Sequence, residues 1–150
     1  MSYGSRYLAF LVSALLLSGC AALTNPMRST RTEGGIRNEN GATIISGRAL
    51  DDQRGSLLDT MEGRVPGMQI QRHPDRCPEV ALRSHVPYNS PINPLVYVDG
   101  TRTGDTCILN QLSTDNVDSI EIYPMGVTLR PGYQTHAHGL ILVFLRGADR

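Results

Sequence analysis

Two histidines near the C-terminal end of the chain are the first candidates for metal chemistry. His136 and His138 are separated by one residue, so an extended chain would place both imidazoles on one side, as in some zinc sites. The pattern indicates no third ligand beside them. We therefore expect surface histidines in a turn, with a two-histidine metal site as the alternative, and we predict no metal and no other cofactor.

Nucleophile and acid patterns give equally little support for catalysis. Ser84 stands beside His85, and Asp51 beside Asp52, but neither pair lies in a nucleophile elbow or in another motif that activates a nucleophile. Adjacent carboxylates are usually solvated, and His73 stands alone in the pattern. We therefore predict that the chain has no catalytic residues and is not an enzyme.

Cys20 has the most specific chemical context in the sequence. Arg6 is followed by an apolar segment over 7–17, and small residues then lead to the cysteine in Leu17-Ser18-Gly19-Cys20. This motif resembles the lipobox of bacterial lipoproteins, whose cysteine is acylated on sulfur before cleavage. The resemblance implies a signal peptide over 1–19 and a lipid anchor with palmitate on Cys20. An ordinary secretory signal cleaved after Ala22, with a free Cys20, is the alternative.

The residues around this cysteine also indicate a location. An apolar segment of about 11 residues is too short to span a bilayer of about 30 Å as a helix, so it serves as a signal and not as an anchor. Ala21 and Ala22 follow the cysteine, and neither is the aspartate that often retains such lipoproteins in the inner membrane. The resemblance therefore implies attachment to the outer membrane, facing the periplasm.

Cys77 and Cys107 remain once Cys20 carries lipid. In an oxidising compartment, an even pair of cysteines is typical of a disulfide. A bridge across a loop of about 30 residues would remove denatured-state entropy worth roughly 3 to 4 kcal/mol in the chain-entropy model. We expect this disulfide. A cysteine-based metal or catalytic site is the alternative, although neither cysteine lies in a Cys-x-x-Cys spacing.

Length and charge limit the partners and the number of domains. The 150 residues include 14 basic and 14 acidic side chains, so the formal net charge is zero. Nucleic-acid binding is disfavoured because it needs an excess of positive charge on one face. A 22-stranded transport barrel needs roughly 220 residues for its strands. We therefore expect one domain, which does not form a transporter by itself.

The segment over 20–41 is predicted to be a flexible tether. From Asn25 to Gly41 the sequence is rich in Asn, Gly, Thr, Arg and Glu and has no apolar period. An irregular segment on the surface of the fold is the alternative. The pattern changes at Ala42, and we predict a single domain over 42–150.

Apolar periodicity predicts short strands and helices in this domain. Ser56 and Asp59 form a capping box ahead of an apolar helical face, which favours a helix from Gln53 to Gly63. A second short helix is expected over 108–112, and Asp99-Gly100 favours a hairpin turn. The continuously apolar run over 140–145 predicts a central strand buried on both faces. The other predicted strands cover 43–45, 68–71, 79–83, 95–98, 101–103 and 118–123.

Four motifs of the domain, in this order, resemble the plug domain of TonB-dependent outer-membrane receptors. They are Leu57–Ile70 (LLDTMEGRVPGMQI), Pro94–Gly100 (PLVYVDG), Val117–Tyr123 (VDSIEIY) and Gly139–Val143 (GLILV). Their order and spacing carry the resemblance. It implies an α+β fold, a small mixed β-sheet with two or three short helices, here as a stand-alone lipoprotein without the barrel. Pro124–Tyr133 departs from the family, which has a Gly-Pro and a small-residue run with Tyr-Gly at this place.

Two functions are compatible with this resemblance. In the first, the chain is a lipid-anchored periplasmic plug-like domain at the outer membrane, a non-enzymatic interaction module that contacts another envelope protein through exposed strand edges. In the second, it is a ligand-binding accessory lipoprotein that captures a nutrient in loops such as 85–93 and hands it to a separate TonB-dependent transporter. We favour the first, and a small-molecule partner belongs to the second.

Overall fold

The computed structural model of the protein describes residues 34–83 and 93–147. The predicted signal peptide over 1–19, Cys20, most of the predicted tether and the proline-containing loop over 84–92 lie outside the described residues. Within the described ranges, no helix has the length and the apolar character needed to cross a membrane.

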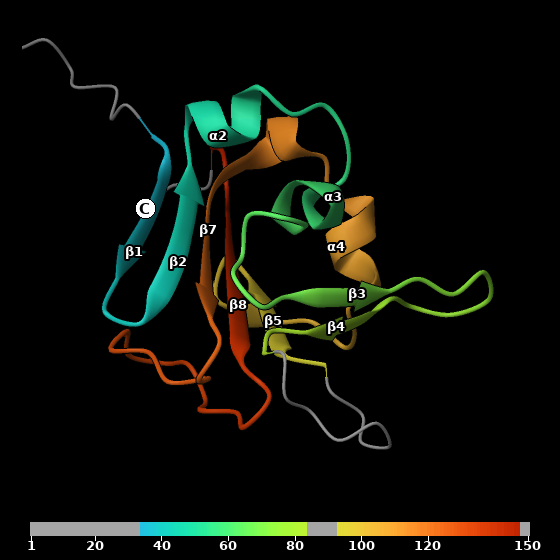
Figure 1. The fold of residues 1–150 in the computed structure, drawn as a ribbon. Helices are drawn as coiled ribbons and strands as arrows, with labels where there is room; N and C mark the ends of the chain where they lie inside the picture. Colours follow the sequence, from blue (N-terminus) through green and yellow to red (C-terminus); the bar gives the residue numbers. More distant parts are fainter. Residues whose placement is uncertain (1–33, 84–92, 148–150) are drawn as a thin grey trace, which may run out of the picture. The chain divides into compact units, whose positions relative to one another are not determined.

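A mixed six-stranded sheet lies at the centre of the domain (Figure 1). Its spatial order is β1-β2-β7-β8-β5-β6; the β5–β8 pair is parallel, and the other neighbouring pairs are antiparallel. The strands are β1 (Ile36–Glu39), β2 (Ala42–Ser46), β5 (Leu95–Val98), β6 (Thr101–Arg102), β7 (Val117–Tyr123) and β8 (Leu140–Leu145). Together with short helices and a second, two-stranded sheet, this confirms the predicted α+β class.

β8 lies inside the sheet, between β7 and β5, as its apolar run predicts. Ile141 and Val143 belong to the core on one face, and Leu140 and Leu142 belong to the core on the other. All four side chains are at most 1% exposed. A strand that is covered on both faces needs apolar residues at consecutive positions, so its sequence shows no alternation.

Helices and the small sheet cover one side of the large sheet, which we call the helix-covered face (Figure 1). The covering elements are α2 (Arg48–Asp51), α3 (Leu57–Met61), β3 (Gln69–Gln71), β4 (Glu79–Ala81), α4 (Cys107–Gln111) and the 3-10 turn Thr114–Asn116. Leu50, Leu58 and Leu109 from the helices pack with Ile120 and Ile141 from the sheet, and none of these side chains is exposed to solvent. This is the larger core of the domain.

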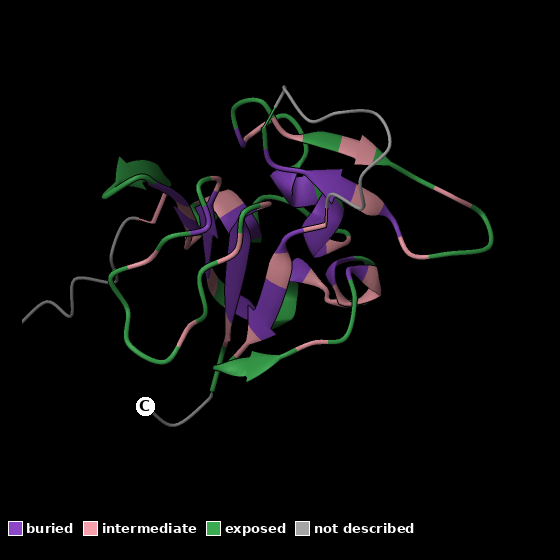
Figure 2. Ribbon diagram, turned by 90° about the horizontal axis from the view of Figure 1, so that it is seen from below, coloured by how far each residue is buried: buried purple, intermediate pink, exposed green. Residues whose placement is uncertain are grey.

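The other side of the sheet is covered by the β7–β8 connection, residues 124–139, and we call it the loop-covered face. Its smaller core contains Ala42, Tyr97, Tyr123, Leu140 and Leu142. Tyr133 from the connection packs edge-on against Tyr97, with ring centres 5.0 Å apart. Figure 2 shows the largely exposed connection on the opposite side of the sheet from the helices. A segment without helix or strand therefore closes this core.

Ser56 caps α3 as predicted, but the helix is shorter than expected. The Asp59 amide donates to Ser56 Oγ at 3.2 Å, and Ser56 Oγ donates to Asp59 Oδ2 at 2.7 Å. The helix spans Leu57–Met61 and not Gln53–Gly63. The residues before Ser56 are not helical because Thr114 binds their carbonyls, through its hydroxyl to Gln53 and through its amide to Gly55.

The sheet begins inside the segment predicted to be a tether. β1 pairs with β2 through a turn at Asn40-Gly41, where φ is 50° and 76°. Asn-Gly favours such positive φ values in hairpins, although this hairpin is not among those predicted above from the sequence. All four residues of β1 are exposed, so they carry no apolar alternation. The domain therefore starts before residue 42, and this corrects the predicted tether boundary at residue 41.

Candidate functional site

β1 forms an open edge of the large sheet. It pairs with β2 on one side, and the strand order of the described residues ends with it. β6, at the opposite edge, is only two residues long. β1 therefore offers the longer row of backbone donors and acceptors without a partner strand, which is the kind of edge to which an extended segment of another protein pairs.

Charged side chains mark the side of β1 that belongs to the loop-covered face. Arg37 and Glu39 occupy alternate positions and lie opposite Ile44 and Ala42 of β2, whose side chains join the loop-covered core. Arg37 Nε is 3.6 Å from Glu39 Oε1. Charges on an edge strand hinder indiscriminate pairing between copies, so a partner segment has to be compatible with both signs.

Glu121 in β7 carries a buried carboxylate on the loop-covered face, and β2 separates β7 from this edge. The Glu121 side chain is 8% exposed. Arg130 from the connection donates to it twice, from Nε to Oε2 at 2.7 Å and from Nη2 to Oε1 at 2.5 Å. The Tyr123 hydroxyl donates to Oε2 at 2.9 Å, and the Arg130 guanidinium lies 5.0 Å from the ring centre of Phe144. These contacts satisfy the buried charge and hold the connection on the sheet.

The same contacts keep both partners of Glu121 in one protonation state. Burial is the largest cause that raises the pKa of the Tyr123 phenol, and the neighbouring Glu121 carboxylate acts in the same direction. The hydrogen bond to Glu121 raises the pKa of Arg130. Tyr123 therefore stays a neutral donor and Arg130 a cation near neutral pH, which suits a structural or binding role and not proton transfer.

A cavity of about 310 Å³ opens beside the Glu121–Arg130 pair. It lies between the β1–β2 turn and the connection and is lined by Glu39, Asn40, Ile44, Glu121, Tyr123, Leu129, Arg130 and Pro131. Its wall is therefore part charged and part aliphatic. Its volume is at the lower end of the range for ligand pockets, so it fits a small ligand or one inserted side chain.

The β7–β8 connection is pinched at its base. The amide of Gly126 donates to the Tyr123 carbonyl at 2.9 Å, and the amide of His136 donates to the Gly126 carbonyl at 3.1 Å. Gly126 has a φ of 65°, and a Cβ atom on it would lie 1.7 Å from the His136 carbonyl oxygen, so only glycine fits. The pinch presents residues 127–135 as a separate loop.

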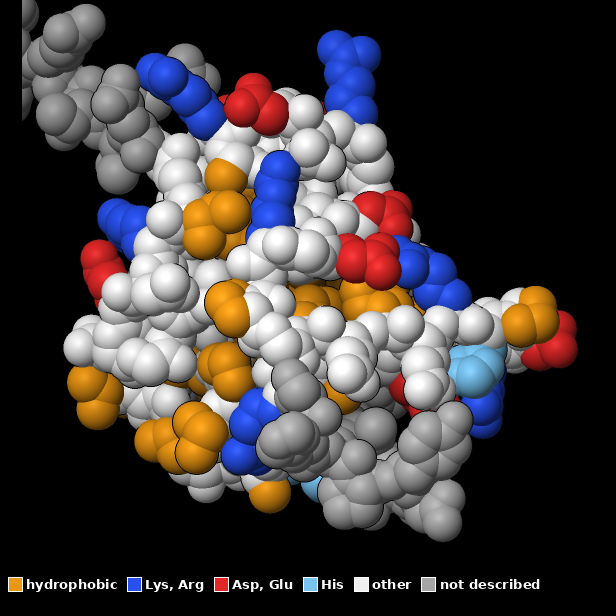
Figure 3. All heavy atoms as spheres, viewed as in Figure 1, with side chains coloured by type: hydrophobic (Ala, Val, Ile, Leu, Met, Phe, Trp, Pro, Cys, Tyr) orange, Lys and Arg blue, Asp and Glu red, His pale blue; other side chains and the backbone are white. Residues whose placement is uncertain are grey.

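Three apolar side chains of the connection project into solvent, and we call them the apolar tip. Met125 is 63% exposed, Val127 57% and Leu129 85%. Among the described residues, one further large apolar side chain is exposed, Ile36 of β1 at 47%. Figure 3 shows hydrophobic side chains on the surface at the lower left, where the connection lies in Figure 1.

The disulfide expected from the sequence is present in the structure. Cys77, in the β3–β4 hairpin, is bonded to Cys107, the first residue of α4, with an S–S distance of 2.04 Å. Asp105 brings a carboxylate oxygen within 4.8 Å of both sulfur atoms. Because the two sulfurs are bonded to each other, they are not available as metal ligands.

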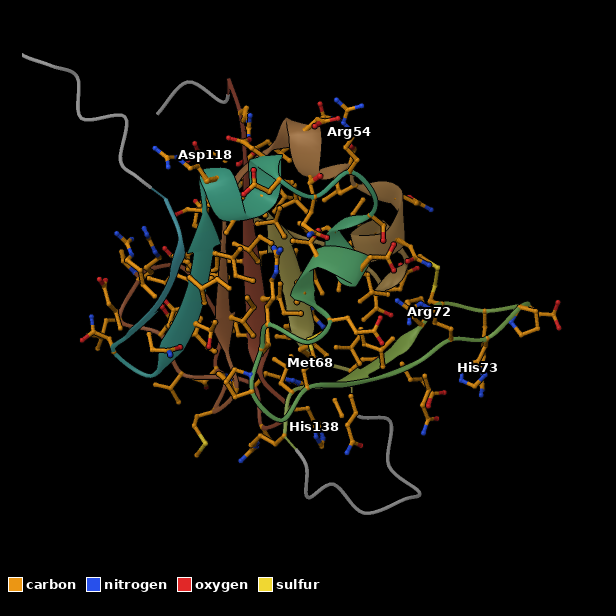
Figure 4. The ribbon with its side chains drawn as sticks, turned by 45° about the horizontal axis from the view of Figure 1, so that its top comes forward. Arg54, Met68, Arg72, His73, Asp118 and His138 are labelled. Atoms are coloured by element: carbon orange, nitrogen blue, oxygen red, sulfur yellow. A yellow bond between two sulfur atoms is a disulfide. The ribbon has the colours of Figure 1, made fainter. Side chains whose placement is uncertain are left out.

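Arg72 forms a second link between the hairpin and the helices (Figure 4). Its guanidinium donates to Asp59 at 2.7 Å and to Glu62 at 2.8 Å, both on the α3 side. The hydrogen bond from Ser56 is the largest cause that lowers the pKa of Asp59, and the hydrogen bond from Arg72 is the largest that lowers the pKa of Glu62. These groups are ionised partners at neutral pH and hold the hairpin in place.

The other residues singled out by the sequence analysis do not form a site in the described part of the chain. The rings of His136 and His138 are 5.4 Å apart, but no third His, Cys, Asp or Glu within the described residues joins them as a possible ligand. The two histidines lie in a turn, as expected, because the Gly139 amide donates to the His136 carbonyl at 3.0 Å. Both side chains are half-buried, and within the described residues His136 Nδ1 has no hydrogen-bond partner. Asp51 pairs with Arg146. Cys20, Ser84 and His85 lie outside the described residues.

The pair of the buried Glu121 carboxylate with Arg130 was not predicted from the sequence. Glu121 lies between two isoleucines of a regularly alternating strand, so the pattern indicates a solvent-facing carboxylate. Its burial depends on a connection that folds back over the strand, and Arg130 is nine positions further along the chain. No periodic signal in the sequence marks such a contact.

Comparisons with known proteins support the fold. No family model matches the sequence, and no curated protein matches it either. Similar solved structures include the RagAB peptide importer in its "closed-closed" state, with a TM-score of 0.53 and 18% identity over 77% of this chain. The "open-open" state of that importer gives a TM-score of 0.51 and 17% identity over 73% of this chain. In both comparisons, the match spans only 12% of the importer chain. The domain therefore shares its fold with a small part of a much longer chain.

Proposed function

We propose that the chain is a lipid-anchored periplasmic plug-like domain, which acts as a non-enzymatic protein-interaction module at the outer membrane. The observation that carries the proposal is the fold shared with a small part of an importer chain, at a TM-score of 0.53. It agrees with the four plug-like motifs and with the lipobox around Cys20. In this proposal Cys20 places the domain at the membrane, and the partner is another envelope protein.

β1 is the contact with that partner in this proposal. It is the longer open edge of the sheet, and the cavity beside Glu121 lies next to its end at Glu39. An extended segment of the partner that pairs with β1 can insert one small side chain into this cavity. Backbone hydrogen bonds then give affinity, and the cavity and the Arg37–Glu39 pair give specificity.

Site-specific photocrosslinking in intact cells tests the contact. A photoreactive amino acid at Arg37, on β1, is expected to give one predominant adduct with an envelope protein, which mass spectrometry identifies. The matched control carries the same group at Arg54, an exposed residue outside the sheet. The same adducts from both positions, or none from Arg37, would contradict the proposed contact.

Fractionation of the envelope tests the anchor. The wild-type chain is expected in the outer-membrane fraction of a density gradient, with labelled palmitate incorporated. Cys20→Ala removes the acylated sulfur, so this variant should be missing from that fraction, whereas Ser18→Ala leaves the cysteine in place and should behave as wild type. Recovery of Cys20→Ala in the outer membrane at the wild-type level would exclude lipid tethering.

The cavity beside Glu121 supports a second candidate function, a ligand-binding accessory lipoprotein that hands a nutrient to a separate TonB-dependent transporter. Its wall combines aliphatic side chains with Glu39, Glu121 and Arg130. A small molecule retained by the purified protein in native mass spectrometry, and lost in a Glu39→Gln variant, would favour this function. A protein adduct through β1 and no retained molecule would favour the first.

A further inference from the structure

We infer that the apolar tip, Met125, Val127 and Leu129, docks onto the interfacial region of a lipid bilayer that contains anionic lipid. This inference rests on the proposed lipid anchor, which keeps the domain beside a membrane. It goes beyond the proposed contact through β1, because the tip belongs to the connection and not to the edge strand. The docked tip would orient the domain and its open edge relative to the membrane.

The exposure of the tip is the first observation behind this inference. Three of the four large apolar side chains exposed in the described residues lie within five positions of each other, and Leu129 is 85% exposed. Large apolar side chains that are exposed together mark a site of contact with another protein or with a membrane. They are suited to the bilayer interface, a fluid environment that does not require a complementary surface.

Charge around the tip supports a membrane as the occupant. The connection over 124–139 contains no Asp or Glu, although the chain has 14 acidic residues. Arg130 lies within the connection, and its side chain is 51% exposed. Arg83 lies at its side, where Nη1 is 3.6 Å from Met125 Sδ and Nη2 donates to the Ala137 carbonyl. Because Arg130 is already paired with Glu121, the attraction for anionic headgroups falls mainly to Arg83, and the exposed apolar side chains supply the rest of the membrane contact.

The tip is held in place by contacts on the loop-covered face. Gly126 and His136 close the base of the loop, Arg130 is bound to Glu121, and Tyr133 packs on Tyr97. The exposed side chains are therefore presented by an ordered segment. Little conformational entropy is lost when such a segment enters a membrane interface.

The chain before the domain is long enough for this arrangement. Thirteen residues lie between Cys20 and Gly34, and at full extension the chain from one to the other reaches roughly 50 Å. A six-residue strand such as β8 is about 20 Å long. β1 begins at the opposite end of the sheet from the connection (Figure 1). The extended chain between Cys20 and Gly34 is longer than the strands that separate these two ends of the sheet. The anchor and the tip can therefore reach one bilayer.

Depth measurements on the lipidated chain test the inference. The chain is reconstituted in vesicles of phosphatidylethanolamine and phosphatidylglycerol, with a nitroxide on Val127→Cys in one sample and on Arg54→Cys in the other. Figure 4 shows Arg54 far from His138 of the connection, so it serves as the control position. Relative to position 54, the label at 127 should collide more often with oxygen and about threefold less often with a water-soluble nickel chelate. Phosphatidylcholine in place of phosphatidylglycerol should weaken this protection.

Two variants distinguish membrane binding by the apolar tip from nonspecific binding by other exposed apolar side chains. Met125→Ser with Leu129→Ser should expose the label at 127 to the nickel chelate, since each aliphatic side chain withdrawn from the bilayer lowers the partition constant roughly tenfold. Ile36→Ser removes a comparably exposed side chain from β1 and should leave the protection unchanged. All three side chains are exposed, so the urea midpoint of the variants should equal that of the starting protein.

Each other outcome overturns the inference. Equal nickel accessibility at positions 127 and 54 means that the tip stays in water. Protection at 127 from both oxygen and nickel in pure vesicles indicates a contact with a second copy of the chain. Protection that occurs only in native envelopes indicates a protein partner. None of these results affects the Cys20→Ala fractionation, so failure of the tip and failure of the anchor are distinguishable.

Discussion

The helix-covered and the loop-covered faces of the large sheet differ in what excludes water from them. On the first, helices and a second sheet bury a continuous apolar cluster. On the second, an irregular connection covers a smaller apolar cluster, pairs its Arg130 with the buried Glu121 carboxylate, and leaves three apolar side chains in solvent. Stability therefore comes mainly from the first face, while the second has the surface features expected of a contact site.

Adjacent positions of β8 give the most direct test of this difference. Ile141 points into the helix-covered core and Leu142 into the loop-covered core, and each is at most 1% exposed. Ile141→Ala should lower the free energy of unfolding by about 4 kcal/mol, because regular elements on every side cannot collapse into the cavity. Leu142→Ala should cost about 2.5 kcal/mol, because the connection can move inward. Urea unfolding measures both. Equal losses, or the reverse order, would show that the connection is as rigid as the helices.

The disulfide gives the next largest effect, on the cover of the first face. Cys77 and Cys107 are 30 positions apart and join the β3–β4 hairpin to α4. Replacing both with serine should lower the free energy of unfolding by roughly 3 kcal/mol in the chain-entropy model. Hydrogen exchange should also become faster in β3 and β4. A reductant should destabilise the wild type and leave the double variant unchanged, and an unaltered urea midpoint in the double variant would contradict this role.

The Glu121–Arg130 pair should give a moderate loss on the second face. Arg130→Ala leaves Glu121 buried without its cation, but the arginine side chain is half exposed, so we expect a loss of only about 2 kcal/mol in urea unfolding. A Glu121→Leu, Arg130→Leu double variant removes both charges and should recover most of that loss. If the double variant is less stable than Arg130→Ala, the charged pair stabilises the fold more than two leucines in its place do.

The same difference decides which parts of the fold the sequence predicts. Local sequence signals are sufficient to predict β8, the Asp99-Gly100 hairpin and the Ser56 cap of α3. The apolar run of β8 leaves no alternative to burial. The disulfide was predicted from an even pair of cysteines together with the oxidising compartment that the lipobox-like motif around Cys20 would imply. β8 contributes to both cores, whereas the Ser56 cap and the disulfide belong to the cover of the helix-covered face.

The rest depends on contacts between distant segments and has no periodic signature. β1 is exposed on both faces, so pairing alone makes it a strand. α2 has four residues and starts after Gly47, whose φ is 56°, and no apolar period of that length predicts a helix. The burial of Glu121 depends on Arg130, which folds back from the connection. The candidate site consists of such features, so the sequence predicts an exposed strand edge without locating it.

Alkaline pH gives the smallest expected effect and acts on the second face alone. Burial raises the pKa of Tyr123 in the folded protein, so the folded state holds the phenol proton more tightly than the unfolded chain does. The stability from this group is fully present below the usual tyrosine pKa of about 10 and is lost as the pH rises above it. Tyr123→Phe should unfold somewhat more readily at neutral pH, because it lacks the hydrogen bond to Glu121, but its stability should fall less steeply above pH 10 or so. Parallel curves for wild type and Tyr123→Phe would mean that the connection opens to water before the phenol titrates, and the second face would then be looser than its contacts suggest.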